Sequence, residues 1–253
     1  MSEREDSVAR DAFLSMVGHE LRQPLAPILT ALEIMRQRRS RESGERARRT
    51  IERQVWQLAR FVDDLLDYSN AQRGVLTVHW QPVLLRQVLE AAIETAQPVL
   101  SHREQRVETT LPEADVTLWG DQARLTQIFA NLLNNTARFT EPGSVIGIDV
   151  TAGATDVAIR VRDTSQGISS DMLREIFRLF VNVEQEKGWP TQGIGLAVVR
   201  TLVELHGGTV EAVNPRDGHG AEFVVVLPLE IPAEAITRQV ARQARNEPDP
   251  QLS

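Results

Sequence analysis

The stretch at residues 13–25, FLSMVGHELRQPL, constrains the fold more than any other part of the chain. From here apolar residues recur at helical spacing, which predicts one long amphipathic helix over residues 7–39. That stripe consists of Phe13, Val17, Leu21, Leu25, Ile28, Leu32 and Met35. His19 is expected at the solvent edge of the stripe, with Glu20 beside it. An imidazole is a good nucleophile near neutral pH because its ordinary pKa is about 6.5. A neighbouring carboxylate can keep one ring nitrogen protonated and leave the other free to attack.

A second amphipathic helix is expected after a polar turn at residues 38–45. Its apolar residues, again at helical spacing, are Ile51, Val55, Leu58, Val62, Leu65 and Leu66. Pro24 and Pro27 each remove a backbone donor from the first helix. We expect them to bend the helix rather than end it, because the apolar period continues to Met35. Such a hairpin leaves apolar surface uncovered, so we expect a homodimer in which two hairpins form a four-helix bundle.

The spacing changes at Gly74, after which strand-like segments and helices follow in mixed order. One strand is expected at residues 75–80, VLTVHW, where apolar and polar residues alternate. The mixed order predicts a two-layer α/β sandwich and an α+β fold for the whole chain. We therefore divide the chain into a hairpin at 7–73 and a sandwich domain at 75–230. The polar segment 231–253 is expected to be a disordered tail or a linker.

Composition excludes several kinds of function. The net charge of −7 argues against a nucleic-acid partner, which would require a basic face. The absence of cysteine excludes disulfides and thiolate chemistry. No apolar run approaches the roughly 20 residues that span a bilayer, and the charged first residues do not fit a signal peptide. We therefore expect a cytoplasmic chain without membrane contact.

The helix expected after Asp121 carries three amides at a spacing of four residues, Gln127, Asn131 and Asn135. Residues at this spacing lie on one helical face. Amide oxygens are hard ligands that suit Mg²⁺, which also binds phosphate oxygens. Arg138, almost one turn further, could reach a phosphate. On spacing alone, a solvated polar face is the alternative.

Two further segments could bind a nucleotide. In VRDTSQGI, residues 161–168, Asp163 ends a strand and precedes a turn with Gly167, so its carboxylate could accept a hydrogen bond from the exocyclic amine of adenine. Gly193 and Gly195 begin a helix, where backbone N–H groups and the helix dipole favour phosphate. Alone, the first segment is equally well a plain turn, and one G-x-G is weak evidence.

Taken together, these segments resemble the five boxes of sensor histidine kinases, in the family order. The string around His19 resembles the phospho-acceptor box, residues 121–140 the N box, and residues 161–168 the first glycine box. Residues 176–180 resemble the phenylalanine box and residues 191–210 the second glycine box. The chain departs from the pattern at Thr136, usually alanine, and at Ser165 and Thr191, usually glycine.

The resemblance implies a kinase core with a Bergerat-type ATP-binding domain that phosphorylates His19 from Mg-ATP and passes the phosphate to an aspartate of a response-regulator receiver domain. Glu20 would accept the imidazole proton. Asn131 and Asn135 would hold Mg²⁺, and Asp163 would bind adenine. The remaining nucleotide-binding positions would be Arg138, Gly167, Gly193, Gly195 and Leu196.

The resemblance also implies a reverse reaction, in which Gln23 would orient the water that attacks the phosphorylated regulator. Many relatives have threonine or asparagine at this position, and because glutamine is one methylene longer than asparagine, we expect weak phosphatase activity. Two other classes remain open. One is a degenerate kinase that acts mainly as a dimeric docking or regulatory module, since both glycine boxes have lost a glycine. The other is an ATPase clamp of the same superfamily, against which the His19 hairpin argues.

Overall fold

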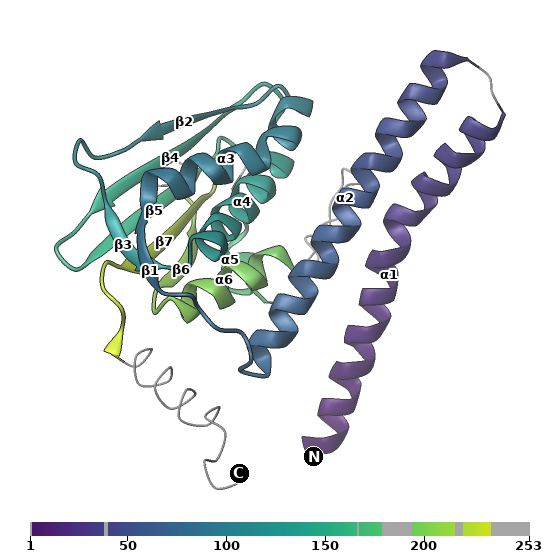
Figure 1. Cartoon of the computed structure of the whole chain (residues 1–253). Helices are drawn as coiled ribbons and strands as arrows, with labels where there is room; N and C mark the ends of the chain where they lie inside the picture. Colours follow the sequence, from purple (N-terminus) through teal and green to yellow (C-terminus); the bar gives the residue numbers. More distant parts are fainter. Residues whose placement is uncertain (1, 38–39, 166, 179–193, 216–219, 234–253) are drawn as a thin grey trace, which may run out of the picture.

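The computed structural model describes residues 2–37, 40–165, 167–178, 194–215 and 220–233. The first two helices form a hairpin, with α1 at Ser2–Arg36 and α2 at Arg41–Gln72 (Figure 1). Helix α1 passes through Pro24 and Pro27 without ending, which confirms that the helix continues. Ser40 caps α2, because its side chain accepts a hydrogen bond from the Ser43 N–H while the Ser43 hydroxyl accepts one from the Ser40 N–H. This reciprocal pair satisfies two donors that a helix start would otherwise leave unpaired.

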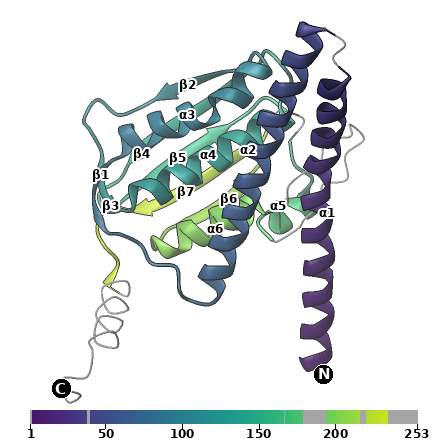
Figure 2. The same ribbon diagram turned by 45° about the vertical axis from the view of Figure 1, so that its right-hand side comes forward.

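The rest of the described chain is a two-layer sandwich, as predicted. Its main sheet has the strand order β2-β4-β5-β7-β6, with β2 and β4 parallel and the other pairs antiparallel. Helices lie over one face of this sheet (Figure 2). The strands are β2 (Arg106–Thr110), β4 (Val145–Ala152), β5 (Asp156–Arg162), β6 (Thr209–Val213) and β7 (Glu222–Pro228). The helices are α3 (Leu85–His102), α4 (Gln122–Phe139), α5 (Ser170–Glu175) and α6 (Gly195–Leu205).

Apolar side chains fill the core between the layers: those at alternate positions of the strands and those at helical spacing along α4. Every second residue of β5 and β7 is buried: Val157, Ile159 and Val161 in β5, and Phe223, Val225 and Leu227 in β7. Helix α4 supplies Leu125, Ile128, Phe129, Leu132 and Leu133, all at 0% exposure. Burying one such side chain contributes about 1.5–3 kcal/mol. This packing fixes which face of α4 points away from the core, and that face carries the amides.

The strand expected at residues 75–80 is wrong. Residues 75–80 have no regular structure, and the strand there is β1 (Gln81–Leu84), which pairs only with β3 (Thr117–Gly120). The backbone N–H groups of Val75 and Leu76 donate instead to the Asn70 carbonyl at the end of α2. In this two-stranded ribbon Pro82 is tolerated, since a strand with one partner does not need a donor at every position.

The hairpin packs on the sandwich through one end of α2. Phe61 is 2% exposed and belongs to the same buried cluster as the sandwich core. Val17, Leu21, Leu65 and Tyr68 are partly buried against that cluster. Other large apolar side chains of the hairpin are exposed, among them Leu25, Leu29, Leu32 and Met35 on α1 and Val55, Trp56, Val62 and Leu66 on α2. The prediction that the hairpin leaves apolar surface uncovered within one chain is thus confirmed.

Candidate functional site

The polar face of α4 lies against α2. Asp121 begins α4, with its Oδ1 accepting hydrogen bonds from the N–H groups of Ala123 and Arg124. One turn further, Gln127 Nε2 donates to Asp67 Oδ2 at 2.9 Å and to Asp64 Oδ1 at 3.2 Å. Arg124 Nη1 also pairs with Asp67 Oδ2, at 2.5 Å. The face expected to bind Mg²⁺ is therefore partly occupied by the hairpin.

Asn131 has both ends of its amide engaged by α2. Its Oδ1 accepts from Arg60 Nη2 at 2.5 Å, and its Nδ2 donates to Asp64 Oδ1 at 3.4 Å. Asn135 is half-buried, and no hydrogen bond between described residues uses its amide. The amide oxygen of Asn135 fits a Mg²⁺ ligand in this structure, whereas the amide oxygen of Asn131 is hydrogen-bonded to a guanidinium.

Charges from the hairpin surround the C-terminal half of α4. Burial raises the pKa of Asp64, an effect that Arg60 and the hydrogen bonds from Gln127 and Asn131 oppose. Burial lowers the pKa of Arg138, as does the nearby Arg60, whereas Asp64 and Glu20 act in the opposite direction. Glu20 is only 5% exposed, although the helical pattern put its neighbour His19 at the solvent edge. The structure thus brings Glu20 and Arg138 within electrostatic range of each other.

Residues from α2 were not identified from the sequence. Arg60, Asp64 and Asp67 are spaced by four and three residues, so they share one face of α2. The spacing itself is a weak signal, because charged residues on one helical face are usually solvated. Their partners on α4 become apparent only once the two helices are placed together.

Asp163 follows β5, as predicted, and its loop is held by backbone groups. Its Oδ1 accepts from the N–H groups of Ser165 and Ala221, both at 2.9 Å, and none of the hydrogen bonds between described residues uses its Oδ2. Gly167 has a φ of 81°, a conformation that favours glycine. Asn214, which the sequence analysis missed, accepts from the Ile168 N–H and donates to the Ile168 carbonyl. The buried carboxylate therefore keeps one oxygen for another donor.

Ser165 fits the loop without backbone strain. Among described residues other than glycine, Glu104 alone has a positive φ, so the Ser165 position does not require glycine. The Ser165 hydroxyl accepts from the Gly167 N–H at 3.2 Å. The loss of this glycine is therefore weak evidence for a degenerate loop.

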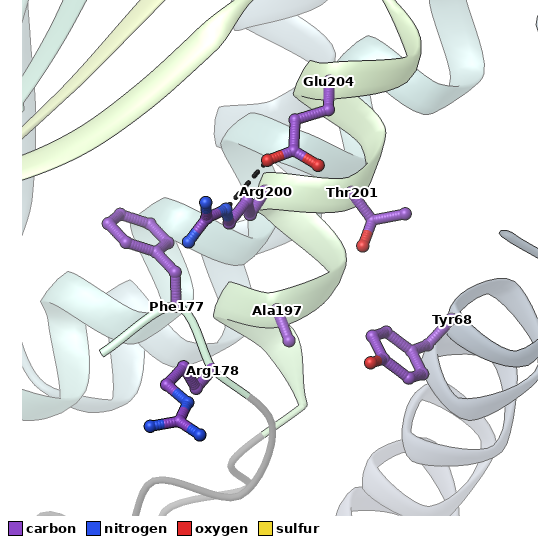
Figure 3. Close-up of a pocket in the computed structure, with 7 residues that line it drawn as sticks. All are labelled: Tyr68, Phe177, Arg178, Ala197, Arg200, Thr201 and Glu204. Atoms are coloured by element: carbon purple, nitrogen blue, oxygen red, sulfur yellow. Dashed lines mark hydrogen bonds and ion pairs between the residues drawn. The ribbon is translucent and has the colours of Figure 1, made fainter. Parts of the chain in front are cut away.

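The start of α6 leaves room for a ligand. A side chain at Gly195 would meet no atom of the described residues within 4 Å, while Leu196 packs against the core. Gly193 and Thr191 lie outside the described residues. Nearby, a pocket of about 380 Å³ lies beside α6, with Tyr68 of α2 at its edge (Figure 3). Its lining residues are Tyr68, Phe177, Arg178, Ala197, Arg200, Thr201 and Glu204.

His206 is a structural residue. Its ring is 1% exposed, Nε2 accepts from the Asp121 N–H at 3.1 Å, and Nδ1 lies 2.7 Å from the Leu202 carbonyl. The Nδ1–H tautomer satisfies both contacts. Burial lowers its pKa, which keeps the ring neutral near pH 7. With both nitrogens engaged, His206 cannot act as a nucleophile.

Two family models match the chain. The model described as "His Kinase A (phospho-acceptor) domain" matches residues 9–74, which include His19 and Glu20. The model described as "Histidine kinase-, DNA gyrase B-, and HSP90-like ATPase" matches residues 120–231, which include α4, the Asp163 loop and α6. A phospho-acceptor hairpin followed by an ATPase domain defines the catalytic core of a two-component signalling kinase. The chain belongs to the histidine kinase family, which confirms the resemblance found in its sequence.

Individual relatives agree with this assignment. The signal transduction histidine-protein kinase BaeS of Escherichia coli (strain K12) is 32% identical over 232 residues, which are 90% of this chain and 48% of BaeS. The chain thus spans about half the length of that relative. The structure of full-length ShkA in complex with AMPPNP is 25% identical, with a TM-score of 0.62, over 88% of this chain and 47% of ShkA.

A third similar protein, the histidine kinase ThkA in complex with the response regulator TrrA, has a TM-score of 0.65 at 18% identity. The match covers 90% of this chain and 64% of ThkA, and it supports the fold. Among the described residues, every helix is too short or too polar to serve as a membrane span.

Proposed function

We propose that this chain autophosphorylates His19 from Mg-ATP and passes the phosphate to an aspartate of a response-regulator receiver domain. The observation that supports the proposal is that a phospho-acceptor hairpin and an ATPase domain follow each other in one chain, with a charge of the hairpin acting on α4. Glu20, next to His19 in sequence, is buried and acts electrostatically on Arg138 of α4. In the proposed function one domain would supply the acceptor and the other the phosphate ligands.

In the proposed mechanism, the residues of the chain act mainly by positioning and by neutralising charge. Glu20 orients the imidazole of His19 and takes its proton as the new N–P bond forms and the bond to the leaving ADP breaks. Arg138 would offer a guanidinium to the phosphates, and the Asn135 oxygen, joined by Asn131, would hold the Mg²⁺ that balances their charge.

The nucleotide base would lie at the other end of the site. Asp163 Oδ2, which no hydrogen bond between described residues uses, would accept the exocyclic amine of adenine, while Gly167 lets the loop turn beneath the ring. Backbone N–H groups of Gly195 and Leu196 at the start of α6 would approach the phosphates, as would Gly193, which lies outside the described residues. Gln23, half-buried on α1, orients water in the reverse reaction. We assign residues 7–73 to the phospho-acceptor part and 75–230 to the ATP-binding part.

Two relatives support the ligand and the partner. ShkA was captured with AMPPNP and ThkA with a response regulator. By analogy, this chain takes an adenine nucleotide and docks a receiver domain.

The direct test is incubation of the protein with Mg-ATP labelled on the γ-phosphate. We expect protein-bound phosphate that survives alkali and is lost in acid, the stability pattern of a phosphohistidine. Omission of Mg²⁺ should prevent labelling. Phosphate that survives acid would place the acceptor on a hydroxyl, and the absence of labelling would favour the docking-module alternative.

The chain is expected to be a homodimer through its hairpin. The exposed apolar side chains of α1 and α2 would be covered by a second copy, and Leu32→Glu should separate the copies because it places a charge in that surface. Light scattering at micromolar concentration should give twice the chain mass for wild type and a lower mass for Leu32→Glu. Val75→Glu, at an exposed position beyond the hairpin, is the matched control and should stay dimeric. A monomeric wild type would contradict the bundle.

A further inference from the structure

The proposed function requires the amide oxygen of Asn131 to bind Mg²⁺, but in this structure the same oxygen is already used by Arg60. The oxygen accepts a hydrogen bond from the cationic Arg60 at 2.5 Å, and the Asn131 side chain is only 5% exposed. A magnesium ion bound to the same oxygen would lie within a few ångströms of the guanidinium. Two cations this close repel each other strongly in a buried site. Either Arg60 or the metal can use the Asn131 oxygen.

Arg60 belongs to a set of contacts that joins α2 to α4. We call it the α2–α4 polar contact, and it consists of Arg60, Asp64 and Asp67 on α2 with Arg124, Gln127 and Asn131 on α4. The three α2 residues follow one another at helical spacing and so do the three α4 residues. The two faces are complementary, because each carboxylate of α2 meets donors of α4.

We propose that the α2–α4 polar contact holds the ATP-binding domain on the hairpin in a state that competes with Mg²⁺–nucleotide for the Asn131 oxygen. The inference rests on the proposed function and adds its regulation. Binding of the metal–nucleotide complex breaks the Arg60–Asn131 bond and thereby weakens the hold of α2 on α4. Coupling is reciprocal, so a change in the hairpin that moves Arg60 alters nucleotide affinity by the same factor.

If Arg60 competes with the metal, removing its positive charge should increase the affinity of the chain for Mg²⁺–nucleotide. In Arg60→Met the side chain keeps its apolar stem and loses its charge. We expect the full chain carrying this variant to bind Mg²⁺–AMPPNP about 10-fold more tightly than wild type by calorimetry, within the usual range of coupling between sites. In EDTA, where AMPPNP binds without metal, the two proteins should have equal affinity. Arg53→Met, on an exposed part of the same helix, is the matched control and should behave as wild type.

The direction in which Arg60→Met changes the affinity for Mg²⁺–AMPPNP distinguishes the possible roles of Arg60. Weaker binding of Mg²⁺–AMPPNP by Arg60→Met would show that Arg60 contacts phosphate, and unchanged binding would show that it does not compete; both overturn the proposal. A gain that persists in EDTA would also overturn it, since the competition is with the metal. A wild type that binds no Mg²⁺–AMPPNP would instead overturn the proposed function itself.

A second measurement follows the two parts of the chain directly in a protein with Arg60 intact. The chain has no cysteine, so Arg49→Cys on α2 and Glu94→Cys on α3, both exposed, give one pair of spin-label sites per chain, and mixing with an excess of unlabelled chain leaves most labelled dimers with a single pair. We expect Mg²⁺–AMPPNP to broaden and lengthen the distance distribution between the labels, and AMPPNP in EDTA to leave it unchanged. A distribution that Mg²⁺–AMPPNP binding does not alter would contradict release of α2 from α4.

Discussion

Replacing His19 by glutamine is expected to reduce acid-labile phosphate to the detection limit after incubation with Mg-ATP. Glutamine has a polar side chain of similar length but no nucleophilic ring nitrogen, so the N–P bond cannot form. Among the other histidines, His206 is buried with both nitrogens engaged. Nucleotide binding should be unchanged, because His19 belongs to the hairpin and Asn135, Asp163 and Gly195 belong to the sandwich.

The matched control for His19→Gln is His102→Gln, at the exposed end of α3. Phosphate is measured after separate acid and alkali treatment of wild type and both variants. His102→Gln should be labelled as wild type. Acid-labile phosphate remaining on His19→Gln would show that a different histidine accepts the phosphoryl group.

Replacing Gly220 by alanine is expected to destabilise the sandwich by about 3 kcal/mol, the sum of a strained backbone position and a steric clash. Gly220 has a φ of 89°, and a Cβ there would lie 2.0 Å from the Asp163 carbonyl oxygen. The backbone cannot easily move away, because the Gly220 N–H donates to the Ser165 carbonyl at 2.7 Å. Since the displaced carbonyl belongs to the residue proposed to bind adenine, nucleotide affinity should fall as well.

Gly143→Ala separates the cost of the strained backbone from the cost of the steric clash. Gly143 also has a positive φ, 77°, but a Cβ there would meet no atom within 4 Å. Its cost should be that of the backbone alone, about 1–2 kcal/mol. The free energy of unfolding in urea is measured for wild type and both variants. Equal losses for Gly220→Ala and Gly143→Ala would mean that the Asp163 loop accommodates the methyl group.

Local patterns in the sequence predicted the helices and the candidate site residues. Helical spacing identified α1, α2 and α4, since the burial of one face is a local property of a helix. Asp163 was identified because a carboxylate at a strand end followed by a turn is visible within eight residues. The strand at residues 75–80 was misplaced because alternation does not show whether a partner strand exists, and pairing with β3 selects residues 81–84 instead.

The interactions missed in the sequence all join distant segments. Asn214 and Gly220 come from beyond α6 to complete the Asp163 loop, some fifty residues along the chain. Arg60, Asp64 and Asp67 have the spacing of a solvated helix face, and only the packing of Phe61 into the sandwich core turns that face toward α4. The burial of Glu20 was likewise not apparent from the helical pattern of α1 alone.

The position of Phe61 has a mechanical consequence. Of the fully buried side chains in the described hairpin, Phe61 alone joins the cluster that also forms the interior of the sandwich. A close-packed interior does not deform continuously, and packed elements exchange between discrete arrangements instead. A twist of α2 about its own axis must therefore either carry the sandwich with it or withdraw the phenylalanine altogether. We therefore expect the hairpin and the sandwich to exchange between a small number of discrete relative arrangements, rather than to move independently as two domains on a flexible linker.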